Sequence, residues 1–209
     1  MTIRAILFDA DEVLQYPDPG RDADLASVLG FVPEPVARFV AEVHAAEDAT
    51  LTGSLDFREA LTPVLARWGV ANKADELRDW LNAITVDQGM LQLVSRLRRR
   101  GYCCALATNQ QPHRAAFMAR QLRYQTLFER CFFSCEMGVA KPDPRYFQLI
   151  LAELQREPSE VLFVDDKPQN VHSAGRLGIH VVCFANSRDG RAHDALREIL
   201  GRLGVDADT

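Results

Sequence analysis

The sequence predicts an α/β fold, in which a Rossmann-like parallel sheet carries helices on both faces and a small all-helical unit follows the first strand. Two patterns lead to this prediction. From residue 88 to residue 209, short apolar runs alternate with segments of helical periodicity, which is typical of a parallel sheet covered by helices. Residues 16–87 show helical periodicity alone. We therefore expect a core domain of residues 1–15 and 88–209, and a helical domain of residues 16–87.

The first strand is predicted at residues 3–8, because Ile6, Leu7 and Phe8 belong to an apolar run that suits a strand buried on both faces. Prolines and a glycine near residue 17 then mark the exit from the core. In the helical domain, apolar residues recur at helical spacing, and no strand is expected there. Its helices are predicted from Pro33 onward and at residues 57–68 and 74–84.

After the insertion, strands and helices alternate to the end of the chain. Gly101 ends the first of these helices, and an apolar strand follows it directly. The predicted strands are residues 102–107, 131–134, 161–164 and 179–184. The predicted helices are residues 90–100, 112–123, 144–155, 168–177 and 192–203.

The composition is that of an ordinary globular protein, with 47% hydrophobic and 25% charged residues among 209. No stretch approaches the roughly 18 apolar residues of a membrane span, and the start lacks the pattern of a secretion signal, so a cytoplasmic location is expected. The net charge of -5 argues against nonspecific binding to nucleic acid. The five cysteines are interpreted as reduced packing residues. The sequence leaves the oligomeric state open.

Polar residues stand at the ends of the predicted strands, which is the place where open α/β sheets bind ligands. They are Asp9 and Asp11, Thr108 and Asn109, Lys141, and Asp165 and Asp166; Asn170 follows in the first turn of the next predicted helix. Two carboxylates as close as Asp9 and Asp11 repel one another unless a cation or a shared proton relieves them. The pair therefore suggests Mg²⁺, which prefers oxygen ligands.

These motifs resemble the four motifs of the haloacid dehalogenase-like hydrolase superfamily. In that family the motifs are an apolar strand with DxDx[VT], a strand ending in Ser or Thr, a Lys often followed by Pro, and a strand ending in DD or GDxxxD. Here they read FDADEVL, LATNQ, AKPDPRYF and FVDDKPQN, in the same order. The helical residues 16–87 are similar in position to the cap that many members insert after the first motif.

The resemblance implies a phosphatase that acts on a small phosphorylated metabolite. Asp9 is then the nucleophile that forms an aspartyl-phosphate, and Asp11 is the general acid and base. Thr108, Asn109 and Lys141 are expected to bind the phosphoryl group and stabilise its charge.

The resemblance also implies a Mg²⁺ site. Its expected ligands are the side chains of Asp9 and Asp166 and the backbone carbonyl of Asp11. Asp165 and Asn170 are expected to orient Asp166 or a metal-bound water.

Two other functions stay open at this stage: a phosphomutase with the same motifs, and a binding module without turnover. A dehalogenase is disfavoured, because family members that attack carbon-halogen bonds typically carry Tyr where this chain has Asp11. One departure concerns Glu12, which stands where relatives often have Gly and is expected to crowd or acidify the entrance to the site. Candidate substrate contacts in the cap are Arg21, Arg38, His44, Arg58 and Lys73.

Overall fold

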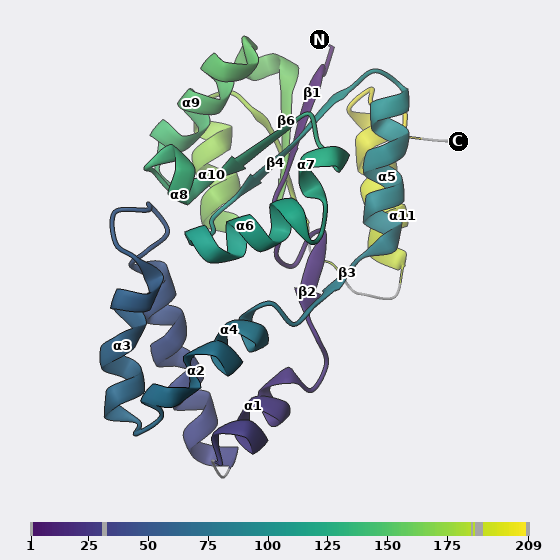
Figure 1. Cartoon of the computed structure of the whole chain (residues 1–209). Coiled ribbons are helices and arrows are strands. Elements are labelled where there is room, and N and C mark those ends of the chain that lie inside the picture. Colours follow the sequence, from purple (N-terminus) through teal and green to yellow (C-terminus); the bar gives the residue numbers. More distant parts are fainter. Residues whose placement is uncertain (1, 31–32, 185, 187–189, 208–209) are drawn as a thin grey trace.

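A computed structural model describes residues 2–30, 33–184, 186 and 190–207 of the chain. Its central feature is a five-stranded, fully parallel sheet with the strand order β5-β4-β1-β6-β7 (Figure 1). This architecture confirms the predicted fold class. The strands are β1 (Ala5–Phe8), β4 (Cys103–Thr108), β5 (Arg130–Phe133), β6 (Val161–Asp165) and β7 (His180–Cys183).

Alternate residues of each strand point to opposite faces of the sheet, and both faces are buried. In β1, Ile6 and Phe8 join one hydrophobic cluster, while Ala5 and Leu7 join the other. The first cluster packs under α5 (Gln88–Arg99), α6 (Pro112–Arg120), α7 (Tyr124–Leu127) and α11 (Arg191–Arg202). The second packs under α9 (Pro144–Leu154) and α10 (Pro168–Arg176). This double burial explains why the strands are continuous apolar runs.

Helices α1 (Arg21–Leu29), α2 (Pro33–Asp48), α3 (Phe57–Arg67) and α4 (Ala74–Leu81) have a hydrophobic cluster of their own, which includes Leu25, Phe39 and Leu77. Figure 1 shows these helices at the lower end of the molecule, beyond the carboxyl ends of the sheet strands. Short helices complete the chain: α8 (Ser134–Met137) and the 3₁₀ turns Ala71–Lys73 and Pro158–Glu160.

The prediction that residues 16–87 contain no strand is wrong. Strands β2 (Gln15–Pro17) and β3 (Ile84–Val86) form an antiparallel ribbon where the chain enters and leaves the helices. Each strand has three residues, too few to show an alternating pattern, and the partner lies far along the chain. The same ribbon explains why α4 ends at Leu81 and not at residue 84 as expected.

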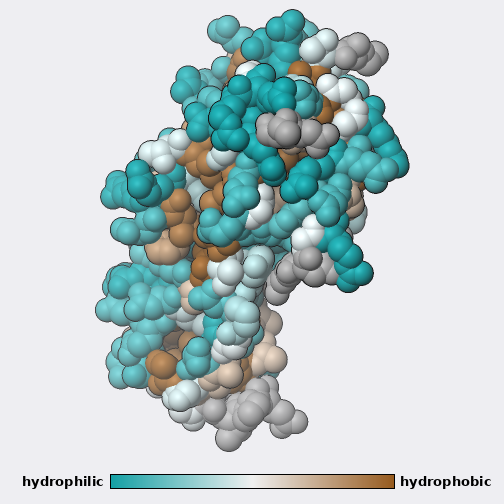
Figure 2. All heavy atoms as spheres, turned by 90° about the vertical axis from the view of Figure 1, so that its right-hand side faces the viewer, coloured by the Kyte–Doolittle hydropathy of each residue, from teal (hydrophilic) through white to brown (hydrophobic). Residues whose placement is uncertain are grey.

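The surface is mainly hydrophilic on the face seen in Figure 2, with apolar residues in small patches. The large apolar side chains that are exposed within the described ranges are Val28, Leu55 and Leu149. In those ranges, none of the helices combines the length and the apolar character that a membrane crossing requires.

Candidate active site

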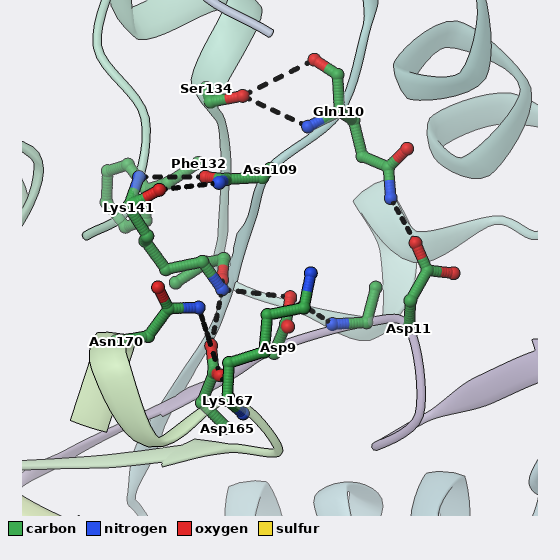
Figure 3. Close-up of polar contacts among 12 residues, drawn as sticks. Asp9, Asp11, Asn109, Gln110, Phe132, Ser134, Lys141, Asp165, Lys167 and Asn170 are labelled. Atoms are coloured by element: carbon green, nitrogen blue, oxygen red, sulfur yellow. Dashed lines mark hydrogen bonds and ion pairs between the residues drawn. The ribbon is translucent and has the colours of Figure 1, made fainter. Parts of the chain in front are cut away.

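The carboxyl ends of three neighbouring strands bring the motif residues together. Asp9 directly follows β1, Asn109 directly follows β4, and Asp165 is the last residue of β6. Because β1 lies between β4 and β6 in the sheet, Asp9 is at the centre of the group. Lys141 reaches the same point from the loop before α9 (Figure 3).

Lys141 joins these elements through its ammonium group. Its Nζ atom lies 3.0 Å from Asp9 Oδ1 and 2.7 Å from Asp165 Oδ2, and it donates a hydrogen bond of 2.8 Å to the carbonyl oxygen of Ala107. The residue is 4% exposed. Burial alone would lower the pKa of Lys141, but the two carboxylates raise it, so the side chain is held as a fixed positive charge.

Asn109 positions this lysine. Its Nδ2 donates to the carbonyl oxygen of Lys141 at 2.8 Å, and the Lys141 amide donates to Asn109 Oδ1 at 2.9 Å. Both polar atoms of this side chain thus bind the Lys141 backbone, and the phosphate contact of Asn109 stays a prediction. Thr108, the last residue of β4, is 1% exposed, and its contact with the phosphoryl group stays a prediction.

Asp9 sits in a setting that disfavours its charge. Burial raises the pKa of Asp9 to about 7, even though Lys141 acts in the opposite direction. One oxygen also accepts a hydrogen bond of 2.8 Å from the Ala10 amide. Asp9 is thus a buried carboxyl group that a nearby cation would convert to the anion.

A divalent cation fits between Asp9 and Asp166. Carboxylate oxygens of Asp9, Asp165 and Asp166 lie within 4.8 Å of one another. The Asp165 carboxylate already accepts hydrogen bonds from Lys141, the Lys167 amide and Asn170. Asp166 Oδ1, by contrast, is buried without a hydrogen-bond partner in the described part of the chain. Burial, and secondly Asp165, raises the pKa of Asp166. A hard cation would satisfy both the lone oxygen and the excess negative charge.

Asp11 lies in a different environment from Asp9. Its carboxylate accepts hydrogen bonds from Gln15 Nε2 at 2.8 Å, Gln110 Nε2 at 2.7 Å and Arg114 Nη2 at 2.7 Å. Burial would raise the pKa of Asp11, but Arg114 and the two amides outweigh burial and lower it. The side chain is therefore held as an anion.

A cavity of about 550 Å³ opens over these residues. Its lining comes from the sheet end and from the helices α1 and α2. Of the proposed cap contacts, Arg21 and His44 line it. The other three lie elsewhere: Arg38 stacks on Trp68, Lys73 pairs with Glu76, and Arg58 lines a separate cavity.

The comparison with protein families agrees with this geometry. A model described as haloacid dehalogenase-like hydrolase matches residues 3–178, which is most of the chain. The chain belongs to the haloacid dehalogenase-like hydrolase family. The family resemblance drawn from the four motifs is thereby confirmed. Three of the motifs lie at strand ends, and Lys141 of the remaining motif reaches them from the loop before α9.

Relatives within and around this family cover the chain to different extents. Pig bifunctional epoxide hydrolase 2 is 27% identical over 98% of the chain, and the chain spans 40% of that protein. The sesquiterpene phosphatase astK of Aspergillus oryzae is 30% identical over 52% of the chain and 57% of its own length. The chain thus spans about half, or less, of the length of these relatives.

Solved structures of similar fold cover nearly the whole chain. A predicted HAD-like family hydrolase from Porphyromonas gingivalis has a TM-score of 0.75 and 25% identity over 96% of this chain and 98% of its own. A HAD family enzyme from Bacteroides thetaiotaomicron, in complex with magnesium and inorganic phosphate, has a TM-score of 0.68 and 22% identity over 86% of this chain and 93% of its own.

Glu12 has a backbone conformation that favours glycine. Its φ is 60°, in the left-handed region that glycine adopts without strain. In the same turn, the Glu12 amide donates to the carbonyl oxygen of Gln15 at 2.7 Å. Glu12 also lines the cavity, so its side chain is placed where it could affect the entrance as predicted.

The sequence analysis did not identify the three residues that hold Asp11. Gln15 and Gln110 are polar residues next to motifs and carry no distinctive signal. Arg114 does carry one: it precedes Met118 by four residues and lies on the same buried face of α6. A charged residue on the apolar face of a helix indicates a buried partner.

Proposed function

We propose that this protein is a Mg²⁺-dependent phosphatase that hydrolyses a small phosphate monoester through an aspartyl-phosphate on Asp9. The observation that carries the proposal is the position of Asp9. It lies at the centre of the sheet end, 3.0 Å from a buried lysine and within 4.8 Å of a carboxylate oxygen of Asp166. A nucleophilic carboxylate beside fixed positive charge is what transfer of an anionic phosphoryl group requires.

In the first half-reaction, a carboxylate oxygen of Asp9 attacks phosphorus and the bond from phosphorus to the leaving oxygen breaks. Protonated Asp11 donates its proton to that oxygen as the alcohol leaves. In the second half-reaction, ionised Asp11 takes a proton from the water that attacks phosphorus. Phosphate and the Asp9 carboxylate are regenerated, and Asp11 is protonated again.

Lys141 contributes by charge and by placement. Its ammonium lies against the nucleophile, where it can stabilise the oxygens of the transferring group. Asp165 and Asn109 fix the lysine from its two ends, by an ion pair at Nζ and by backbone hydrogen bonds. We infer that these two residues position the catalytic groups and do not touch the substrate through their side chains.

Mg²⁺ would be held by the side chains of Asp9 and Asp166 and the backbone carbonyl of Asp11. When bound, it neutralises charge between the anionic nucleophile and the anionic substrate. The complex of the Bacteroides enzyme with magnesium and phosphate supports magnesium as the cation. The similarity to the Aspergillus sesquiterpene phosphatase supports phosphate hydrolysis as the reaction.

Helices α1–α4 would act as the cap of this active site. Arg21 of α1 and His44 of α2 line the cavity together with Asp11 and Lys141. A cap over the strand ends excludes water and contacts the leaving group.

The test is phosphate release from p-nitrophenyl phosphate in Mg²⁺ by the wild-type protein and by Asp9→Asn. We expect turnover by the wild type and its loss in the variant. Equal rates would reject Asp9 as nucleophile. No release from a broad panel of phosphate esters would favour a binding module, and isomerisation of a sugar phosphate without phosphate release would identify a mutase.

A further inference from the structure

One wall of the active-site cavity is formed by the last turns of α2. His44, Glu47 and Asp48 line the cavity there, together with Asp11 and Lys141 from the sheet end. Glu47 is unusual because it is 8% exposed, and a carboxylate is rarely buried so deeply without partners.

The two carboxylate oxygens of Glu47 differ in their partners. Oε2 lies 3.4 Å from His44 Nδ1. Oε1 is buried and has no hydrogen-bond partner within the ranges that the structure describes. A buried acceptor without a donor is unfavourable, so such a group at a cavity wall indicates a ligand that supplies the donor.

We propose that the substrate is a small, hydroxyl-rich phosphate monoester, and that a hydroxyl of its leaving group donates a hydrogen bond to Glu47 Oε1. This inference rests on the proposed phosphatase function and names the class of its substrate. Glu47 is then a specificity-determining residue on the leaving-group side of the cavity.

The charges around Glu47 favour a hydroxyl over an ammonium group as the donor. Two guanidinium groups, those of Arg21 and Arg114, already interact electrostatically with the Glu47 carboxylate. Positive charge is thus already present near this carboxylate, whereas Oε1 has no hydrogen-bond donor among the described residues. A hydroxyl also accepts hydrogen bonds, and Arg21 and His44 on the same wall can supply them.

The rest of the lining disfavours an apolar leaving group. Among the described residues that line the cavity, Pro17 and Leu51 are the only apolar ones. A terpenyl or alkyl chain would displace water from Glu47, Asp48 and Arg21 without replacing its hydrogen bonds. The substrate class thus differs from the one named for the Aspergillus sesquiterpene phosphatase.

Matched substrates test this inference. We would measure kcat/KM for glycerol 3-phosphate and ribitol 5-phosphate against propyl and pentyl phosphate, which have the same chain lengths without the hydroxyls. The wild type is expected to prefer the better polyol phosphate at least about tenfold, as a hydrogen bond to a charged group is worth about 1.5–3 kcal/mol. Glu47→Gln is expected to lose most of this preference while retaining turnover of p-nitrophenyl phosphate.

Two further variants complete the design. Glu42→Gln removes a carboxylate from the same helix, but Glu42 pairs with Arg67 and Trp68 outside the cavity. The preference of this variant for polyol over alkyl phosphates should therefore match that of the wild type. Glu47→Asp keeps the charge and withdraws it from the cavity, so an intermediate preference is expected. It also serves if Glu47→Gln does not fold.

Several results would overturn the inference. Equal kcat/KM for polyol and alkyl phosphates, with turnover abolished by Asp9→Asn, would reject the substrate class and leave the phosphatase intact. An unchanged preference in Glu47→Gln and Glu47→Asp would reject the role of Glu47. A higher kcat/KM for 3-aminopropyl phosphate than for any polyol phosphate would assign a cationic leaving group instead. No turnover of any ester, including p-nitrophenyl phosphate, would reject the proposed function itself.

Discussion

The ion pair between Arg114 and Asp11 gives the sharpest prediction about stability. Replacing Arg114 with Met keeps an unbranched apolar stem on α6 but removes the guanidinium that donates to Asp11 Oδ1 at 2.7 Å. Asp11 then retains its two amide donors, Gln15 and Gln110. We expect the free energy of unfolding to fall by about 2 kcal/mol at neutral pH in metal-free buffer.

The magnitude follows from the burial of the two partners. The Arg114 side chain is 9% exposed and that of Asp11 is 38% exposed. Removing one partner of a fully buried pair costs about 3–5 kcal/mol, whereas exposed pairs contribute about 0–1 kcal/mol. Because Asp11 can recruit water in the variant, the loss lies between these limits. In a protein of this size it corresponds to about 4–8 °C in Tm.

The loss should also depend on pH. Since Arg114 helps to lower the pKa of Asp11 in the folded protein, the pair stabilises the fold above the ordinary pKa of Asp, about 3.9. This contribution disappears as the pH falls through the lower pKa of the folded state. The difference between wild type and Arg114→Met is therefore largest at neutral pH and shrinks in acid.

Urea denaturation at a series of pH values, with EDTA present, measures both effects. Arg67→Met is the control, because Arg67 pairs with Glu42 at the same distance of 2.7 Å but its side chain is 65% exposed. Its loss should stay below about 1 kcal/mol and change little with pH. A loss in Arg114→Met as small as in this control, or one independent of pH, would refute the reasoning.

Three further predictions concern the metal and two backbone positions. Asp166→Asn should weaken Mg²⁺ binding at least about tenfold in calorimetric titration. The control Asp143→Asn, which changes a surface carboxylate paired with Arg145, should leave Mg²⁺ binding unchanged, and equal affinities of the two variants would exclude Asp166 as a ligand. Glu12→Gly should be more stable in urea than Glu12→Ala by about 1 kcal/mol, because both variants remove the side chain but only glycine adopts a φ of 60° without strain. The reverse order of stability would show that the backbone at this position is not strained. Gly53→Ala should lower the free energy of unfolding more than Gly20→Ala. Both glycines have a positive φ, but an added Cβ at Gly53 would overlap the carbonyl oxygen of Cys135, whereas at Gly20 it meets open space. Similar losses of unfolding free energy would show that the loop shifts freely.

Most of the core fold could be predicted from the sequence because it depends on local patterns. Parallel strands buried on both faces are continuous apolar runs, and the helices between them have clear periodicity. The ribbon of β2 and β3 was missed for the opposite reason. Pairs such as Tyr16 with Thr85 depend on a contact across the whole helical insertion, and no local signal announces them.

The candidate site divides in the same way. Asp9 and Asp166 directly follow strands, and they could be predicted to meet because the sheet fixes where its strands end. Lys141 lies in the loop before α9, and only the motif it belongs to placed it with them. The partners of Asp11 could not, because Arg114 and Gln110 reach it from the turn and helix after β4, and their side-chain directions follow from tertiary packing. The same limit applies to Glu47, whose role depends on how α2 lies over the sheet end.

The two acids of the first motif have opposite environments, and this difference bears on the proposed mechanism. In the absence of ligands, burial raises the pKa of Asp9 to about 7, and Arg114 with two amides lowers that of Asp11. The first half-reaction needs the reverse, an ionised Asp9 and a protonated Asp11. A cation beside Asp9 and Asp166 favours the Asp9 anion, and an anionic phosphate beside Asp11 favours its protonated form. Binding of cation and substrate together would therefore set both acids in the states that catalysis requires, while either one alone would set only one of them.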